Sequence, residues 1–237
     1  MVTCTDGEWL RAMQFITSKG RCSVIYGMLD GIPVISRSKG GILAGFLASS
    51  KKHPQWEFMM TSAEGIWRHD LMPKIPKEND VYSDYYGARN LPGTSFNDRA
   101  LIANSNSMYI SNVTIQAGAH IDGIQFTYRD ARNGQHDKSK TQHHGGFGGT
   151  HYSFELGEGE YIVSVSGKYN EKYLTQLCFG TNLGRMSDVY GGGAGNTFSA
   201  RAPLGDVERY LRLQYILGKS DHVGLNGVIF VWTPDFH

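Results

Sequence analysis

Short stretches in which apolar and polar residues alternate recur along most of this chain, and they constrain its fold more than any other feature. The alternation is clearest at 113–116, 124–128, 161–165 and 211–215. Successive side chains of a β-strand point to opposite faces, so this period of two predicts strands with one buried face. The continuous apolar run at 228–232 predicts a strand that is buried on both faces.

Glycine separates these stretches. The chain has 30 glycines and 7 prolines among 237 residues, whereas glycine usually makes up about 7% of a protein. Glycine-rich segments at 157–159, 191–193 and 195–196 fall between the alternating stretches, where tight turns use the backbone freedom of glycine. Only residues 7–13 show a weak helical pattern. Many short strands joined by glycine-rich turns predict an all-β sandwich, barrel or prism.

Charge and hydropathy narrow the function classes. The net charge is +1 and the pI is about 7.8, which argues against nucleic acid as an electrostatic partner. The longest apolar run, 40–48, is too short to cross a bilayer, so no membrane insertion is expected. The first residues lack the basic head and apolar stretch of a secretory signal. This favours a cytosolic protein, but a longer N-terminus would leave secretion open.

The residues that commonly bind metals show no spacing typical of a metal site. Cys4, Cys22 and Cys178 are far apart and form no C-x-x-C pair, which predicts ordinary thiols rather than a zinc site or a disulfide framework. One polar stretch holds several histidines and an aspartate without regular spacing: His136, Asp137, His143, His144 and His151. We therefore expect no metal and no cofactor.

An internal repeat divides the chain. Residues 10–31 align with residues 174–195 without a gap, at a constant offset of 164. Nine of the 22 aligned positions are identical: Leu10, Phe15, Thr17, Gly20, Arg21, Ser23, Tyr26, Gly27 and Gly31 of the first copy. After small gaps, 42–46 resembles 211–215 and 65–67 resembles 227–229. The first copy therefore matches only the second half of the unit that ends at residue 237.

Composition marks a boundary between the two copies. Residues 71–80 carry two prolines and several charges with little to pack, which is typical of an extended linker. We therefore expect residues 1–70 to form a partial repeat, 71–81 a linker and 82–237 a complete domain.

Several motifs, in order, resemble the jacalin-related lectins. They lie at 121–128, 144–150, 159–162, 165–169, 179–185 and 195–198. The resemblance covers roughly 82–237 as a whole domain and 10–70 as a partial one. It implies the all-β fold called β-prism I, in which three four-stranded Greek-key sheets surround a pseudo-threefold axis. It also implies a lectin that binds sugars without metal and catalyses nothing.

The family pairs a glycine-rich loop with a G-x-x-x-D turn to form its sugar site. By this resemblance the site residues are Gly118, His120, Ile121, Asp122, Gly148 and Gly149. A carboxylate such as Asp122 can accept two sugar hydroxyls at once, and charge-assisted hydrogen bonds are about twice as strong as neutral ones. The backbone N–H groups of the turn would donate, and the glycines would let main chain approach the sugar ring.

The other loop–turn pairs depart from the family pattern. A weaker second sugar site would combine Gly93 with Asn226, which lacks the charge and second acceptor of an aspartate, and the proline before Gly93 offers no N–H. A third pair, 191–195 facing 167–170, lacks the aspartate. In the partial repeat, Glu64 is expected at the aspartate position.

The resemblance implies mannose-type oligosaccharides or glycoproteins as partners, because uncleaved family members usually prefer mannose or glucose. Shallow sites bind single sugars weakly, so a homo-oligomer or a longer tandem chain would supply avidity. Sulfated glycans remain an alternative, because basic residues gather at 51–53.

Two other classes of function stay open. A prism that has lost sugar binding would serve as a scaffold or a protein-interaction module, as the degraded second site and the partial repeat suggest. Asp122 and the glycines of 145–149 would then be ordinary turn and hairpin residues. A glycan-processing enzyme would need two carboxylates flanking one cleft, and the spacing singles out no such pair.

Overall fold

The fold was analysed in a computed structural model of the chain. The structure describes residues 1–17, 21–28, 30–38, 42–68, 80–88, 91, 93–102, 107–130, 138–205 and 209–234. Apart from its last two residues, the linker expected at 71–81 lies outside the described residues.

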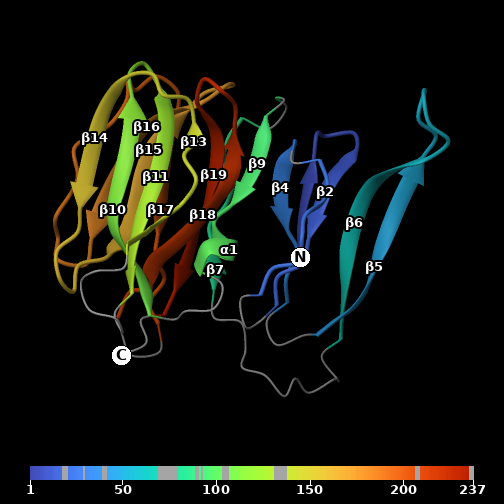
Figure 1. The fold of residues 1–237 in the computed structure, drawn as a ribbon, viewed down its shortest axis with the longest axis horizontal. Coiled ribbons are helices and arrows are strands. Elements are labelled where there is room, and N and C mark those ends of the chain that lie inside the picture. Colours follow the sequence, from blue (N-terminus) through green and yellow to red (C-terminus); the bar gives the residue numbers. More distant parts are fainter. Residues whose placement is uncertain are drawn as a thin grey trace.

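Residues 81–233 form three antiparallel sheets around one core (Figure 1). The β10–β11 sheet has the order β12 (Lys138–Lys140), β11 (Ile121–Asp130), β10 (Met108–Ala117) and β14 (Thr150–Glu155), and β13 (His144–Gly145) also pairs with β11. The β15–β16 sheet has the order β16 (Leu174–Thr181), β15 (Ile162–Tyr169) and β17 (Asn196–Arg201). The β18–β19 sheet has the order β7 (Val81–Tyr82), β19 (Leu225–Thr233), β18 (Arg212–Ser220) and β9 (Thr94–Asn97), and β8 (Tyr86–Gly87) also pairs with β19.

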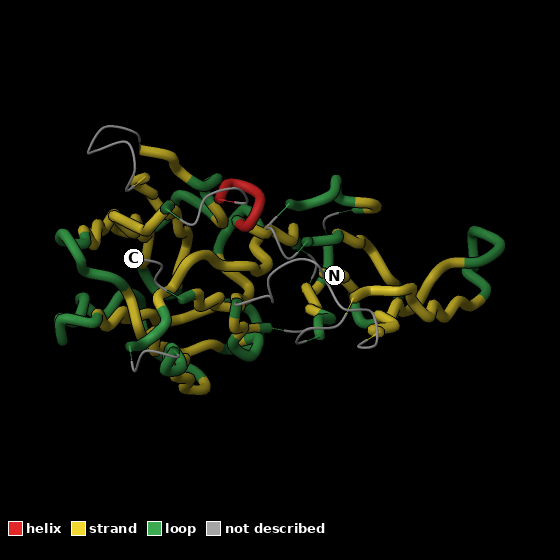
Figure 2. Tube along the Cα trace, turned by 90° about the horizontal axis from the view of Figure 1, so that it is seen from below, coloured by secondary structure: helices red, strands yellow, loops and turns green. Residues whose placement is uncertain are grey.

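Residues 2–68 form a smaller unit of one sheet and one hairpin, which we call the N-terminal unit. Its sheet has the order β3 (Tyr26–Gly27), β2 (Leu10–Gln14), β1 (Val2–Thr5) and β4 (Ile32–Ile35). Its hairpin pairs β5 with β6: Ile42–Lys51 and Met59–Arg68. The one helix among the described residues is α1, Arg99–Ile102 (Figure 2), and no described helix is long and apolar enough to cross a membrane. The all-β prediction is confirmed, and the weak helical pattern at 7–13 becomes part of β2.

The inner faces of the sheets bury the alternating apolar residues at 113–115 and 124–128, whereas both faces of 211–215 are buried and Tyr161 and Val163 are only half-buried. Ile115, Phe126, Val165 and Phe179 are fully buried or nearly so. Phe230 packs on Phe198 across two of the sheets, with ring centroids 6.2 Å apart. Burying such side chains contributes roughly 1.5–3 kcal/mol each, so the period-two pattern sets which face of each strand meets the core.

Each of the three sheets carries a β-bulge at the start of the second strand of its central hairpin. The residues left unpaired are Asp122, Thr175 and Asn226. The carbonyl oxygen of each bulge residue lies against a glycine with positive φ, at 145, 191 and 87 respectively, so close that a Cβ there would lie 2.2–2.3 Å away. The same bulge and the same close glycine thus occur once in each of the three sheets, as a pseudo-threefold arrangement requires.

The N-terminal unit repeats the hydrogen bonding of the β15–β16 sheet at the offset of 164. Met13 pairs with Tyr26 as Leu177 bridges Tyr190. The amide of residue 17 donates to the carbonyl of residue 21 over 2.9 Å, and residues 181 and 185 do the same over 2.9 Å. The division of the chain into two domains and a linker nevertheless stays a prediction.

The later part of the repeat is shifted relative to the sequence alignment. The β5–β6 hairpin has two bulges, at Ala44 and Thr61, which correspond to those at Gln214 and Asn226 in the β18–β19 hairpin. Residues 65–67 therefore match 230–232 rather than 227–229. Thr61, and not Glu64, stands at the aspartate position, because a bulge adds a residue without adding a ladder pair.

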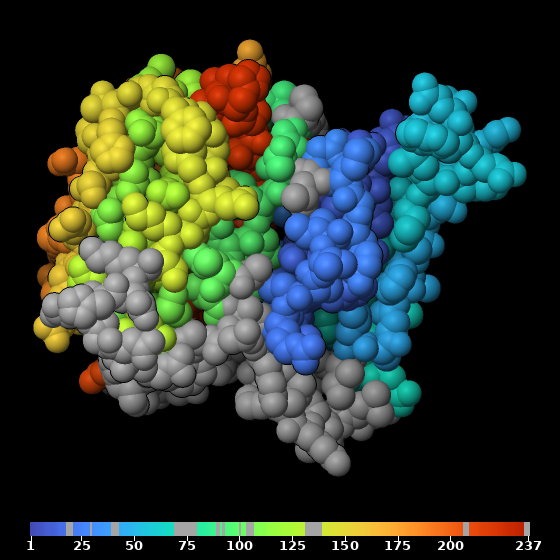
Figure 3. All heavy atoms as spheres, viewed as in Figure 1, coloured from blue at the N-terminus to red at the C-terminus, as the bar shows by residue number. Residues whose placement is uncertain are grey.

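The N-terminal unit is seated on the outer face of the β18–β19 sheet, beside β9 (Figure 3). Ser95 donates through Oγ to the carbonyl of Gly31 over 2.6 Å, and Asn97 donates to Gln14 over 3.2 Å. Val2 joins the main hydrophobic core. The contact is therefore apolar with specific hydrogen bonds around it.

Candidate functional site

The predicted turn and glycine loop meet around Asp122. The turn between β10 and β11 is closed by a hydrogen bond of 3.0 Å from the Gly118 amide to the His120 carbonyl, and the loop is tied on by a bond of 2.7 Å from the Gly146 amide to the Asp122 carbonyl. A Cβ at Gly148 would lie 2.7 Å from Asp122 Oδ1, and one at Gly149 would lie 2.7 Å from Oδ2. Bare main chain therefore lies against the carboxylate.

One oxygen of the Asp122 carboxylate, Oδ2, accepts no hydrogen bond within the protein. The residue is only 8% exposed. Its Oδ1 lies 3.5 Å from His120 Nε2, and its buried Oδ2 accepts no hydrogen bond. A buried polar atom without a partner costs about 1–3 kcal/mol and calls for an explanation. A hydroxyl donated by a ligand would supply the missing bond once the Gly149 main chain beside Oδ2 moves aside.

The side chains of His120 and Ile121, which precede Asp122 in the turn, lie in different surroundings. The His120 ring stacks on Tyr173, with centroids 4.6 Å apart, and a Cβ at Gly224 would lie 2.8 Å from its Cδ2. The side chain of Ile121 is fully buried in the core, so Ile121 can offer a ligand only its main chain. His120 thus connects the turn to the loops at 171–175 and 222–224.

Sequence reasoning missed an aromatic side chain at the same edge. Phe147 is 79% exposed, and its ring stacks on His143 with centroids 4.2 Å apart. His143 is held in turn by a hydrogen bond of 2.7 Å between its Nε2 and the Gly146 carbonyl. A rigid, exposed ring suits the apolar face of a sugar. The signal available in the sequence was an aromatic residue between two pairs of glycines.

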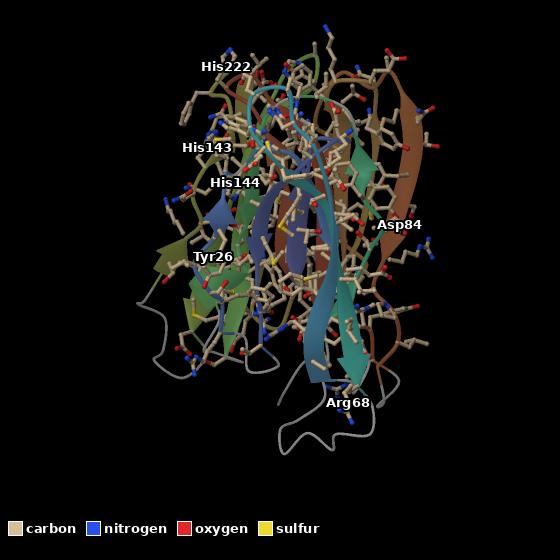
Figure 4. All side chains as sticks on the ribbon, turned by 90° about the vertical axis from the view of Figure 1, so that its right-hand side faces the viewer. Tyr26, Arg68, Asp84, His143, His144 and His222 are labelled. Atoms are coloured by element: carbon tan, nitrogen blue, oxygen red, sulfur yellow. The ribbon has the colours of Figure 1, made fainter. Side chains whose placement is uncertain are left out.

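The histidines near this edge have separate roles. Figure 4 shows His143, His144 and His222 at the same end of the molecule. His144 is buried and lies 2.7 Å from Asp98, where burial raises the pKa of that carboxyl despite the histidine beside it. His144 also stacks on Phe96 at 3.7 Å. His144 therefore joins the β10–β11 sheet to the β18–β19 sheet.

The weaker second site has the same bulge as the Asp122 turn, and the buried Oδ1 of its Asn226 accepts no hydrogen bond, as at Oδ2 of Asp122. A Cβ at Gly93 would lie 2.8 Å from Asn226 Oδ1. Asn226 is fully buried, and its Nδ2 donates to Lys172 O at 3.0 Å and to Asp221 at 3.1 Å. The amide donors are therefore used within the protein. The proline before Gly93 lies outside the described residues.

The third loop–turn pair is filled by its own side chains. The bulge residue Thr175 donates to Ala194 O at 2.6 Å, and Lys168 donates to Gly193 O at 2.8 Å. The loop at 191–195 therefore meets 167–170, as the sequence suggested, through Lys168 and the main chain of Tyr169, and it also meets the bulge residue Thr175. In the N-terminal unit the matching bulge residue is Arg11, whose guanidinium binds both oxygens of Asp30 at 3.0 and 2.9 Å.

Among the residues that the structure describes, no group of three or more His, Cys, Asp or Glu side chains could hold a metal ion. His136 and Asp137 lie outside the described residues. No disulfide joins Cys4, Cys22 or Cys178.

Comparison with known proteins places this geometry in a family. The family model of the jacalin-like lectin domain matches residues 87–208. Jacalin-related lectin 4 of Arabidopsis thaliana is 29% identical over 196 residues, which are 81% of this chain and 24% of the relative. The chain thus spans about a quarter of the length of that relative.

Solved structures share the fold at low identity. Malaysian banana lectin has a TM-score of 0.50 and 22% identity, over 65% of this chain and 98% of the lectin. A mannose-binding jacalin-related lectin from Ananas comosus has a TM-score of 0.51 and 19% identity, over 66% and 99%. Artocarpin, in a complex with mannotriose, has a TM-score of 0.52 and 17% identity, over 66% and 99%.

These likenesses confirm the β-prism I fold. The family model covers 122 of the 237 residues, from 87 to 208, and so includes the turn and loop around Asp122. This chain therefore belongs to the family of proteins with a jacalin-like lectin domain.

Proposed function

We propose that this protein is a non-catalytic lectin that binds mannose- or glucose-type glycans at the Asp122 site, without metal or cofactor. Carbohydrate binding is the function of the family, and two of the solved relatives are named for mannose binding or a mannotriose complex. The observation that carries the proposal is the buried, unpartnered Oδ2 of Asp122 beside Gly149.

The chemistry follows from the polarity of a sugar. Vicinal hydroxyls would donate to the two oxygens of Asp122, and charge-assisted bonds of this kind are the strong ones. Main chain at Gly148 and Gly149 can approach the ring because no side chain intervenes. Phe147 would cover an apolar face of the sugar. Gly118, His120 and Ile121 complete the turn, and no step of this recognition needs a metal.

Binding to Asp122 is tested with a glycan array and with titration of methyl α-mannoside, both in the presence of a chelator. We expect the wild-type protein to bind and Asp122→Asn to lose about tenfold to a hundredfold in affinity, since a hydrogen bond to a charged group contributes roughly 1.5–3 kcal/mol. The matched control is Asp84→Asn, a change of the same kind at another face (Figure 4). If Asp122→Asn binds as well as the wild type, this site is wrong.

A second candidate is a protein-interaction module that keeps the prism without sugar binding. The side chains at Thr175 and Asn226 favour it, because the Thr175 hydroxyl and the Asn226 amide donors are used within the protein. It predicts no enrichment on any glycan array for the wild-type protein. Binding that Asp122→Asn abolishes would eliminate it.

A further inference from the structure

The N-terminal unit exposes apolar side chains at positions that the C-terminal prism buries. Tyr26 corresponds to Tyr190 at the offset of 164, and the two are 56% and 3% exposed. Val34 corresponds to Phe198, and these are 49% and 8% exposed. Exposed apolar side chains that cluster on one face commonly mark an interaction surface.

The β5–β6 hairpin shows the same contrast. The shared bulges align Phe46 with Ile216, and these residues are 45% and 0% exposed. Ile216 pairs with Phe230 across its hairpin, so both side chains lie on the side that faces the prism core. Phe46 therefore lies on the side of β5 that would face a core of the same kind.

In the C-terminal prism, strand β14 of the β10–β11 sheet covers Tyr190, and Tyr86 of β8 stacks on Phe198 at 4.4 Å. Tyr152 packs on Tyr190 at 5.1 Å, and Phe154 packs on Phe179 at 6.2 Å. The matching Phe15 and Tyr26 of the N-terminal unit contact each other at 6.3 Å, as Phe179 and Tyr190 do at 6.4 Å. Among the described residues, nothing equivalent to β14 lies over them.

The outer face of the same kind of sheet is polar where it meets solvent. In the β15–β16 sheet this face carries Ser166, Lys168 and Gln176. The matching outer face of the N-terminal unit, with Val2, Cys4 and Ala12, is buried against β9. The apolar outer face of the N-terminal unit is thus covered, whereas Tyr26, Val34 and Phe46 on its inner face are exposed.

We propose that the inner face of the N-terminal unit, formed by Tyr26, Val34 and Phe46, docks the front half of another jacalin-like unit. That half supplies an antiparallel sheet of the β10–β11 type and completes a second prism. The prism of this chain supports such an occupant, since Tyr152 and Tyr86 of its own front half cover Tyr190 and Phe198, the counterparts of Tyr26 and Val34. The proposal is independent of sugar binding.

The test uses the chain 1–237 and an extended chain in which a copy of residues 80–164 precedes Met1. Met1 corresponds to Val165 at the offset of 164, so the added half enters in register. We expect amide exchange in β2 and β5 to slow at least tenfold in the extended chain. Unchanged exchange there, with the added half unprotected, would overturn the proposal.

Aspartate substitutions provide a second readout. Tyr26→Asp and Phe46→Asp should leave the melting temperature of 1–237 unchanged but abolish the added protection in the extended chain. The matched controls Tyr190→Asp and Ile216→Asp should destabilise both chains, because they bury a charge. Equal tolerance of Tyr26→Asp in both chains would overturn the proposal. So would a stable dimer of 1–237 that Tyr26→Asp dissociates, since that would assign the face to a second copy.

Discussion

Gly148 and Gly149, which are neighbours at the candidate site, lack a Cβ for different reasons. Gly149 has φ of +69°, and a Cβ there would lie 2.4 Å from the carbonyl carbon of Ala117. Gly31 and Gly195 approach their own strands in the same way, with φ of +135° each. Gly149 is therefore required by the fold. The three atoms nearest to a Cβ at Gly148 all belong to the side chain of Asp122, so its lack of a Cβ serves that carboxylate.

We expect Gly148→Ala to weaken glycan binding at least tenfold while the melting temperature changes little, because its new methyl group meets only the Asp122 carboxylate. Titration with methyl α-mannoside and thermal unfolding measure the two effects. Gly157→Ala is the matched control, since a Cβ there meets its nearest atom at 3.5 Å. Full affinity in Gly148→Ala would show that the sugar does not use this carboxylate.

Gly149→Ala should instead destabilise the protein. The left-handed backbone costs a non-glycine residue about 1–2 kcal/mol, and the contact with Ala117 adds to this cost. Chemical denaturation measures the change in the free energy of unfolding. Gly159→Ala has a similar φ of +70° and nothing within 4 Å of the new Cβ, so it isolates the backbone part. Equal losses in the two variants would remove the steric argument.

At the scale of elements, an ion pair holds the start of β15 to the turn that follows β16. Glu160 is 6% exposed and accepts two hydrogen bonds of 2.8 Å from Arg185. These bonds lower the pKa of Glu160 to about 2. Because the folded-state pKa is below the unfolded one, Glu160 stabilises the protein above about pH 4.5, and this contribution is lost as the pH falls towards 2.

We therefore expect Glu160→Gln to lower the midpoint of unfolding at pH 7 and to flatten its decline between about pH 4.5 and 2. Thermal scans across this pH range measure both effects. The exposed neighbour Glu158→Gln is the matched control and should behave as the wild type does. A wild-type acid profile in Glu160→Gln would contradict the assignment.

At the scale of the whole molecule, the contact between the N-terminal unit and the prism encloses a charge. Lys219 is 1% exposed, and its Nζ makes no hydrogen bond. Burial lowers its pKa, although Asp30 of the N-terminal unit acts in the opposite direction. A folded-state pKa below the unfolded one means that the charge destabilises the protein at neutral pH and that this penalty fades as the pH rises.

Lys219→Met should accordingly raise the melting temperature at pH 7, because it keeps the side-chain volume and removes the buried charge. Lys168 occupies the matching position of the β15–β16 hairpin and donates to Gly193 at 2.8 Å. Lys168→Met therefore serves as the control and should lower the melting temperature. A loss of stability in Lys219→Met would mean that the charge is used in the folded protein.

Alternation and glycine content determined the all-β class without any tertiary information, because strand faces and tight turns are local properties of the chain. The repeat at residues 10–31 was also visible, since its turn glycines occupy fixed positions. The resemblance located the turn at Asp122 and the loop at Gly148 and Gly149, which the structure brings together. Whether these residues bind sugar stays a prediction.

Only the tertiary structure decided the register beyond the first part of the repeat and the state of each loop–turn pair. The bulge at Thr61 adds a residue without adding a ladder pair, and a comparison of the two sequences alone does not reveal it. The filling of one pair by Thr175 and Lys168, and the exposure of Phe147, depend on contacts between segments far apart in the chain. The contrast between Tyr26 and Tyr190 has the same origin, since burial depends on which sheet lies opposite a strand and not on the strand itself.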